Sequence, residues 1–319
     1  MKSSAKSHPI QGLVKYHGLK NEKLRIPFHD SISVATKPTE THTTVEFGDF
    51  EEDTASVDGA SMSGVGLERI LAVVDEIRAR SGVTERFKME SRNNFPSNIG
   101  LGASASGFAA LAVAACDAAG LELSLEEIST IARRGAGSAA RSVTGAFSLW
   151  TTGHDDEDSF SHQIASEDFQ MGIVVALVPA YKSTDDAHRD VIGSPFFHSR
   201  LAYVHGALAE MKSAIKRRDI QRIGEIAEKD SLILHGITMT GTDELILWRP
   251  ETVKVILEVK KMRSEGVPAH FSIDTGATVY INTDMDNAGI VEERIKSLGM
   301  GTMRCGVGGA ARLTDEHLF

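Results

Sequence analysis

The chain has 319 residues, of which 41% are apolar and 24% charged, as in ordinary globular proteins with a well-buried core. Its formal net charge of −10 argues against nucleic acid or an anionic membrane surface as the main partner. We expect a cytoplasmic protein without a disulfide framework, because there are only two cysteines, no apolar run of about 20 residues and no signal-peptide core.

The first half of the chain mixes strand and helix patterns. Alternating stretches rich in Ser, Thr and Val predict strands within residues 31–47, and a further strand is predicted at 146–150. Apolar residues at helical spacing predict a helix at 65–80, and another is predicted at 108–119. Ser124-Leu125-Glu126-Glu127 reads as a capping box before a helix that ends at Gly135-Ala136-Gly137.

The second half continues the mixture. The predicted order is a strand at 172–178, helices at 197–217, 219–229 and 251–265, strands at 269–273 and 277–282, a helix at 289–298 and a strand at 302–307. This spacing is too irregular for a doubly wound parallel sheet. It favours an α+β protein of two lobes, residues 1–168 and 169–319, with the functional site in the cleft between them.

A glycine-rich loop at residues 94–107 opens directly onto the helical sequence at 108–119. Its glycines let the backbone approach a ligand closely, and the helix offers unpaired N–H groups to an anion. Hydroxyls of Ser104 and Ser106 could reach a phosphate oxygen or its metal ion. The loop therefore indicates a phosphate-binding site, although a tight turn that allows close helix packing also fits. It is not a Walker loop, because no Gly-Lys-Ser/Thr follows the glycines.

Four ordered motifs carry a resemblance to a known family. Pro96-x-x-x-Gly100-Leu101-x-x-Ser104 resembles the second motif of the GHMP small-molecule kinases, and its context resembles the ATP-dependent mevalonate-type decarboxylases. Three further segments match that branch in order: Lys15-Tyr16-His17-Gly18, Gly137-Ser138-Ala139-Ala140-Arg141-Ser142 and Asp274-Thr275-Gly276-Ala277. The resemblance covers roughly residues 5 to 310. It implies the GHMP kinase fold, with a ribosomal-S5-like first lobe and a ferredoxin-like second lobe.

The resemblance also implies the ligands. ATP would bind the loop through Asn98, Gly100, Leu101, Gly102, Ala103, Ser104 and Ser106. Mg²⁺ would arrive with ATP, held largely by phosphates and by Ser104. The partner is then a phosphorylated small molecule, and we expect a homodimer.

Asp274 follows an apolar strand and precedes a Thr-Gly turn. From sequence alone, an Asx-turn that caps the bend and a catalytic carboxylate fit equally well. The resemblance implies that Asp274 faces the tertiary hydroxyl of the substrate, to orient it or accept its proton. It places Lys15 beside this carboxylate, where the ammonium would stabilise the transferring phosphate; by itself Lys15 would be a surface charge.

Arg141 follows a run of small residues where the backbone can approach a ligand, although a surface arginine at a helix end also fits. The resemblance implies that its guanidinium fork holds the carboxylate that leaves as carbon dioxide. Substrate oxygens would also meet Tyr16, His17, Gly137, Ser138 and Lys182. Lys182 lies where the family has Lys-x-x-Ser-Ser, but this chain has Asp185 and Asp186 near the serine positions.

Leu19 is the departure that bears on the substrate. The diphosphomevalonate enzymes have a second lysine at this position, which contacts the diphosphate. The absence of this lysine predicts a substrate with one phosphate. The Lys-Tyr-His-Gly variant of the motif resembles that of the archaeal phosphomevalonate decarboxylases most. The prediction is ATP-dependent decarboxylation of 5-phosphomevalonate, the alternatives being the diphosphate reaction and a 3-kinase without decarboxylation.

The acidic stretch 154–158 is predicted to be a solvated loop.

Overall fold

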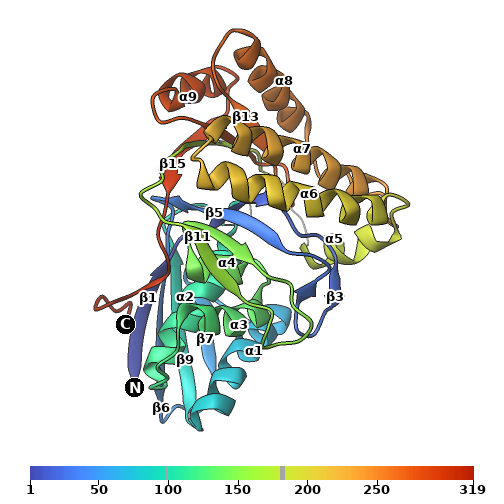
Figure 1. Ribbon diagram of the computed structural model, residues 1–319. Helices are drawn as coiled ribbons and strands as arrows, with labels where there is room; N and C mark the ends of the chain where they lie inside the picture. The colour runs from blue at the N-terminus through green and yellow to red at the C-terminus, as the bar shows by residue number, and fades with distance from the viewer. Residues whose placement is uncertain (98–99, 180–183) are drawn as a thin grey trace.

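A computed structural model describes residues 1–97, 100–179 and 184–319. Its first sheet has the order β16-β1-β6-β9-β7-β8. These strands span Arg312–Thr314 (β16), Lys2–Ser7 (β1), Thr41–Gly48 (β6), Arg86–Asn93 (β9), Thr54–Val57 (β7) and Ala60–Ser61 (β8). Helices α1 (Gly64–Ser81), α2 (Ala103–Ala118) and α3 (Leu125–Gly135) pack with it around one apolar core. The two chain ends lie close together because β16 pairs with β1 (Figure 1).

The second sheet has eight strands in the order β11-β10-β5-β15-β12-β14-β13, with β2 also paired to β5. They span Ser161–Ala165 (β11), Phe147–Trp150 (β10), Ser31–Lys37 (β5), Gly301–Val307 (β15), Gly172–Leu177 (β12), Val279–Thr283 (β14), His270–Ser272 (β13) and Ile10–Val14 (β2). Since β5 pairs with β15, this sheet joins the early and late parts of the chain.

Helices cover both faces of the part of this sheet around β12. Successive strand residues point to opposite faces, so Ile173 and Val175 pack with α6 (Phe197–Lys216) and α7 (Ile220–Met239). Val174 and Ala176 pack with α8 (Pro250–Ser264) and α9 (Ala288–Lys296). Figure 1 shows these four helices in the upper half of the molecule.

The remaining elements are short. They are β3 (Leu19–Asn21), β4 (Ile26–Pro27), α4 (Ala139–Thr144), α5 (Thr184–Asp190) and a 3₁₀ turn at Val191–Gly193. Among the described residues, every strand pair is antiparallel except β7 with β9, so the α+β class is confirmed and a doubly wound sheet is excluded. Within the same residues, no helix is both long and apolar enough to cross a membrane.

The predicted helices agree with the structure apart from some of their ends. The capping box of α3 is present, with the Ser124 hydroxyl and the Glu127 carboxylate each accepting the other residue's backbone N–H. Helix α2 begins at Ala103 instead of residue 108, and α7 continues to Met239 instead of ending at 229. The sequence misplaces the end of α7 because Asp230 and Ser231 interrupt the apolar pattern, whereas both side chains are buried and paired in the fold.

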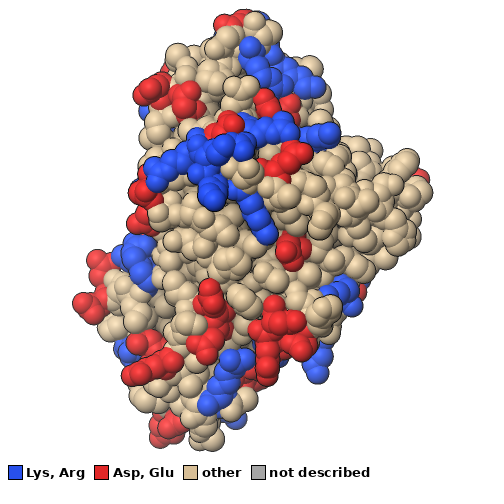
Figure 2. Space-filling view, in the orientation of Figure 1, with Lys and Arg blue, Asp and Glu red and all other residues tan. Residues whose placement is uncertain are grey.

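Charge is spread unevenly over the surface despite the net charge of −10. Figure 2 shows Lys and Arg gathered over the upper part of one face, in the region of α6 and α7, while acidic side chains are more numerous below. Cations of α7 and of the link before it are paired, Arg218 with Asp168 and Arg222 with Glu210 and Glu225. The net charge therefore says little about the field at any one site.

Candidate active site

One cavity of about 540 Å³ collects the predicted motifs from both halves of the chain. Among the residues that the structure describes, its lining includes four cationic side chains, Lys15, Arg25, Arg69 and Arg141, together with one carboxylate, Asp274. Such an excess of positive charge in an acidic protein fits a site for anionic ligands. The described chain around the cavity also supplies Tyr16, Gly137, Ser138, His188 and residues Gly100 to Ala105.

The glycine-rich loop forms one wall of the cavity. Gly100 and Gly102 have φ values of +84° and +75°, in the left-handed region that glycine adopts most easily. A Cβ on Gly102 would lie 3.2 Å from the carbonyl oxygen of Ile10, so this close approach also favours glycine. Because α2 starts at Ala103, its first residues line the cavity, and the positive end of the helix faces an incoming ligand.

The two serines of the loop have different surroundings. Ser104 is exposed and lines the cavity. Ser106 is completely buried, and its hydroxyl pairs with that of Thr41 at 2.6 Å. Ser106 therefore joins α2 to β6, a different position from the ligand contact that the sequence suggested. Asn98, also predicted to bind ATP, lies outside the described residues.

Lys15 is buried, unlike the surface lysine that its sequence context alone would suggest. Its ammonium donates to the hydroxyls of Ser231 at 3.0 Å and Ser272 at 2.9 Å. Burial lowers the pKa of Lys15, while Asp230 and Asp274 oppose that shift. The structure thus holds the ammonium at a fixed place beside Asp274 in the cavity wall.

Asp230 is the residue behind Lys15 that sequence reasoning missed. Its carboxylate accepts the backbone N–H of Lys15 at 3.0 Å and lies 3.8 Å from its ammonium. Arg200 donates to Asp230 at 2.9 Å and to the carbonyl oxygen of Lys15 at 2.7 Å. The indication in the sequence is an acid on the apolar face of α7, four residues from both Ile226 and Leu234.

Asp274 lines the cavity and is partly buried. The backbone N–H of Gly12 donates to its two carboxylate oxygens at 3.1 and 3.3 Å, and His235 contacts its carbonyl oxygen at 3.0 Å. A Cβ on Gly12 would lie 2.6 Å from Cγ of Lys15 and 3.0 Å from Oδ1 of Asp274. Gly12 therefore lets the lysine, the aspartate and strand β2 meet closely, another feature that the motifs did not reveal.

Arg141 is also buried, although it lines the cavity. It donates to the hydroxyl of Ser31, and its guanidinium lies 5.3 Å from the ring centre of Tyr16 and 5.8 Å from that of Trp150. Burial lowers the pKa of Arg141 to about 10, which leaves it protonated at neutral pH. A buried, protonated guanidinium facing a cavity fits a carboxylate ligand.

The other predicted substrate contacts occupy different positions. Tyr16 and Ser138 line the cavity, and Gly137 leaves room for Tyr16, because a Cβ there would lie 2.7 Å from the tyrosine hydroxyl oxygen. His17 is buried and its ring packs 4.8 Å from that of His188, which lines the cavity itself and stacks on Tyr16. His17 thus supports the wall from behind. Lys182 lies outside the described residues.

Comparison with known proteins agrees with the motifs. Residues 7–161 match the diphosphomevalonate decarboxylase-like N-terminal domain, and residues 173–298 match the mevalonate 5-diphosphate decarboxylase C-terminal domain. Phosphomevalonate decarboxylase of Haloferax volcanii is 49% identical over 99% of this chain and 98% of its own. Diphosphomevalonate decarboxylase of Candida albicans is 29% identical over 90% and 86% of the two chains.

Solved structures are similar over the whole chain. Mevalonate diphosphate decarboxylase from Enterococcus faecalis superposes with a TM-score of 0.92 at 30% identity, covering 99% of both chains. A structure described as MDDEF in complex with MVAPP, AMPPCP and magnesium gives a TM-score of 0.93, again at 30% identity and 99% coverage of both chains. The chain has the GHMP kinase fold, as predicted. It belongs to the mevalonate-type decarboxylase family.

Proposed function

We propose that this protein catalyses the ATP-dependent decarboxylation of (R)-5-phosphomevalonate to isopentenyl phosphate, ADP, phosphate and carbon dioxide, a step of isoprenoid biosynthesis. The observation that carries the proposal is the meeting of Lys15, Arg141 and Asp274 in one cavity beside the N-terminus of α2. The relative that matches the full length at 49% identity bears the name phosphomevalonate decarboxylase, which supports the choice of substrate.

Each of the three side chains has a chemical task in this proposal. Asp274 orients the tertiary 3-hydroxyl of the substrate and accepts its proton. Lys15, protonated beside it, stabilises negative charge on the phosphoryl group as the oxygen–phosphorus bond forms. Arg141 holds the substrate carboxylate until the carbon–carbon bond breaks, and the electrons of that bond form the alkene as phosphate leaves from C3.

The residues around the loop fit ATP with Mg²⁺. The N-terminal turn of α2 offers positive charge to phosphates, and Ser104 lies at the cavity surface as a hydroxyl ligand. Among the described residues, no group of three His, Cys, Asp or Glu side chains could hold a metal, so the cation would be carried mainly by phosphate oxygens. When bound, ATP would supply the γ-phosphoryl group that makes the 3-hydroxyl a leaving group, and Mg²⁺ would offset negative charge on its phosphates.

Direct comparison of two substrates tests the proposal. Purified protein is given ATP, Mg²⁺ and either (R)-5-phosphomevalonate or (R)-5-diphosphomevalonate, while carbon dioxide and ADP are measured. Because Leu19 supplies no charge where the diphosphomevalonate enzymes have a lysine, we expect the monophosphate to be preferred at least about tenfold in kcat/KM. Preference for the diphosphate would make the protein a diphosphomevalonate decarboxylase, and ADP without carbon dioxide would make it a 3-kinase.

Three further expectations belong to the same proposal. We propose that the protein acts in the cytoplasm. We also propose a homodimer, for which the large apolar side chains of Ile192 and Phe196, exposed beside α6, offer a contact surface. Light scattering in solution tests the dimer.

We also propose lobes of residues 1–168 and 169–319, whose division falls in the turn between β11 and β12. The return of β16 to the first sheet means that the last residues pack with the first lobe.

A further inference from the structure

The loss of the lysine at position 19 raises the question of which cation meets the substrate's phosphate. Leu19 begins strand β3, which pairs with β4 to form a hairpin. Neighbouring Lys20 is exposed and donates to the carbonyl oxygen of Gly153, while Lys23 is exposed at the turn. Among the described residues of this hairpin, Arg25 is the one that lines the cavity.

The backbone at Arg25 has an unusual conformation. Its φ is +51°, in the left-handed region that long side chains rarely adopt. The turn is closed by hydrogen bonds from the Arg25 N–H to the carbonyl oxygen of Glu22 at 3.3 Å and from the Leu24 N–H to Asn21 at 3.0 Å. Such a conformation persists where the surrounding structure holds it, and from this turn Arg25 lines the cavity.

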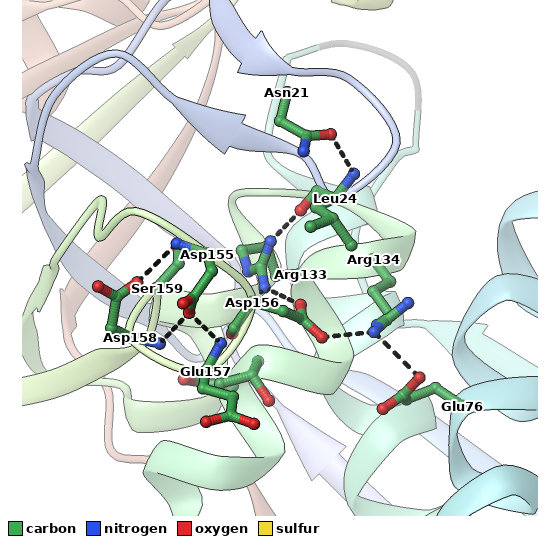
Figure 3. Close-up of polar contacts among 12 residues, drawn as sticks. Asn21, Leu24, Glu76, Arg133, Arg134, Asp155, Asp156, Glu157, Asp158 and Ser159 are labelled. Atoms are coloured by element: carbon green, nitrogen blue, oxygen red, sulfur yellow. Dashed lines mark hydrogen bonds and ion pairs between the residues drawn. The ribbon is translucent and has the colours of Figure 1, made fainter.

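A buried arginine holds this turn in place. Arg133 of α3 is fully buried and donates to the carbonyl oxygen of Leu24, the residue directly before Arg25 (Figure 3). Arg133 also pairs with the carboxylate of Asp156, which Arg134 contacts at 2.5 Å. We call Arg133, Arg134 and Asp156 the hairpin clamp.

The hairpin clamp gives the acidic loop a structural task. In Figure 3 the loop at 154–158 curls around Asp155 and Asp158, whose carboxylates accept backbone N–H groups. Arg134 ties Asp156 further to Glu76 of α1 at 3.0 Å. The expectation of a merely solvated loop is therefore wrong for Asp156, whose charge compensates the buried Arg133.

The position of the hairpin in the chain indicates that Arg25 lies on the substrate side of the cavity. It continues directly from the segment that carries Lys15 and Tyr16, so the chain runs from the ammonium beside Asp274 outward to Arg25. The clamp ties it to α3, whose C-terminal end leads into the Gly137–Arg141 segment. Arg69, the other cation of this wall, donates to the carbonyl oxygen of Gly135 and stacks on Phe108.

We propose that Arg25 is the specificity-determining cation that binds the C5 phosphate of the substrate, and that the hairpin clamp positions it. This inference rests on the proposed function. A guanidinium can donate two parallel N–H groups to a phosphate, whereas the lysine of the relatives offers a point charge. The guanidinium of Arg25 supplies one such pair of donors in place of that lysine, which matches a substrate with a single phosphate group.

The test compares Arg25→Met with Lys23→Met, which removes an exposed cation from the same turn. We expect Arg25→Met to raise the KM for 5-phosphomevalonate at least about tenfold, the value of one lost charge-assisted contact. The KM for ATP, the kcat, and the inhibition constant of unphosphorylated (R)-mevalonate should stay within about threefold of wild type, which is about 0.65 kcal/mol. Lys23→Met should resemble wild type throughout, and Arg25→Lys should recover part of the loss.

A positioning role for the clamp is tested with Asp156→Asn, which should raise the same KM without lowering kcat in proportion. Thermal unfolding of each variant shows whether it is folded at the assay temperature. An unchanged KM for the phosphorylated substrate in folded Arg25→Met would overturn the proposal. So would a rise confined to the KM for ATP, or an equal weakening of unphosphorylated mevalonate.

Failure of the proposed function has a different signature. It would be seen in the wild-type products, as absent carbon dioxide or a preference for the diphosphate. The Arg25 proposal is judged by the ratio of variant to wild type, measured with whichever phosphorylated substrate the wild type turns over.

Discussion

Replacing Asp230 by Asn removes the charge that two buried cations share. The Asp230 side chain is fully buried, and those of Arg200 and Lys15 are only 1% and 5% exposed. Breaking a buried ion pair by removing one partner costs about 3–5 kcal/mol, because the other charge is left without compensation. Asn still offers an acceptor to the Lys15 backbone N–H, so we expect a loss of about 3 kcal/mol in the free energy of unfolding.

The same substitution should change the pH dependence of activity. Burial holds the pKa of Lys15 below the ordinary lysine value, and Asp230 is the largest influence that raises it. The proposed chemistry needs the protonated ammonium, so activity is lost as the pH rises through this pKa. Without Asp230 the pKa falls further, and the alkaline limb of kcat/KM should move to lower pH. In the wild type, Lys15 binds its proton less tightly when folded, so this group makes folding more favourable as the pH rises between the folded and unfolded pKa values.

Urea unfolding and a pH profile of kcat/KM measure the two effects. Asp75→Asn is the matched control, because Asp75 is 64% exposed and pairs with Arg78 on the surface of α1. That variant should lose less than about 1 kcal/mol and keep the wild-type profile. A stability for Asp230→Asn within about 1 kcal/mol of wild type, together with an unmoved alkaline limb, would refute the assigned role of this carboxylate.

Three further predictions concern the cavity. Asp274→Asn should lower turnover at least about 10²-fold while ATP still binds, and near-normal turnover of this variant would remove Asp274 from the mechanism. If Asp274 and Lys15 act as a unit, the double variant Asp274→Asn/Lys15→Met should lose less activity than the product of the two single losses. Arg141→Lys keeps the charge but not the fork, so kcat/KM should fall strongly, whereas a purely structural arginine would leave it nearly unchanged in a folded variant. Gly12→Ala should lower kcat because the new Cβ would lie 2.6 Å from Cγ of Lys15. The control Gly107→Ala places its Cβ in open space within α2, so it should stabilise the fold by about 1 kcal/mol without affecting kcat. Equal activities of the two variants would contradict the close approach at Gly12.

The sequence by itself determined the features that are local. Capping at Ser124, the apolar spacing within α1 and the glycines of the loop before α2 depend on neighbours along the chain. Helices α1 and α3 formed where predicted, whereas α2 follows the loop as predicted but begins five residues earlier. The four ordered motifs also predicted the family and hence the fold. They named Lys15, Arg141 and Asp274, which the structure brings to one cavity.

Only the tertiary structure decided what surrounds those residues. Asp230 lies 215 residues from Lys15, and Arg133 lies 109 residues from the carbonyl oxygen of Leu24 that it holds. No local pattern distinguishes such a buried charge from a solvated one, because its protonation and its energetic cost depend on partners that only folding supplies. For the same reason Arg25 belongs to none of the four motifs, whereas the hairpin and its clamp place it at the cavity.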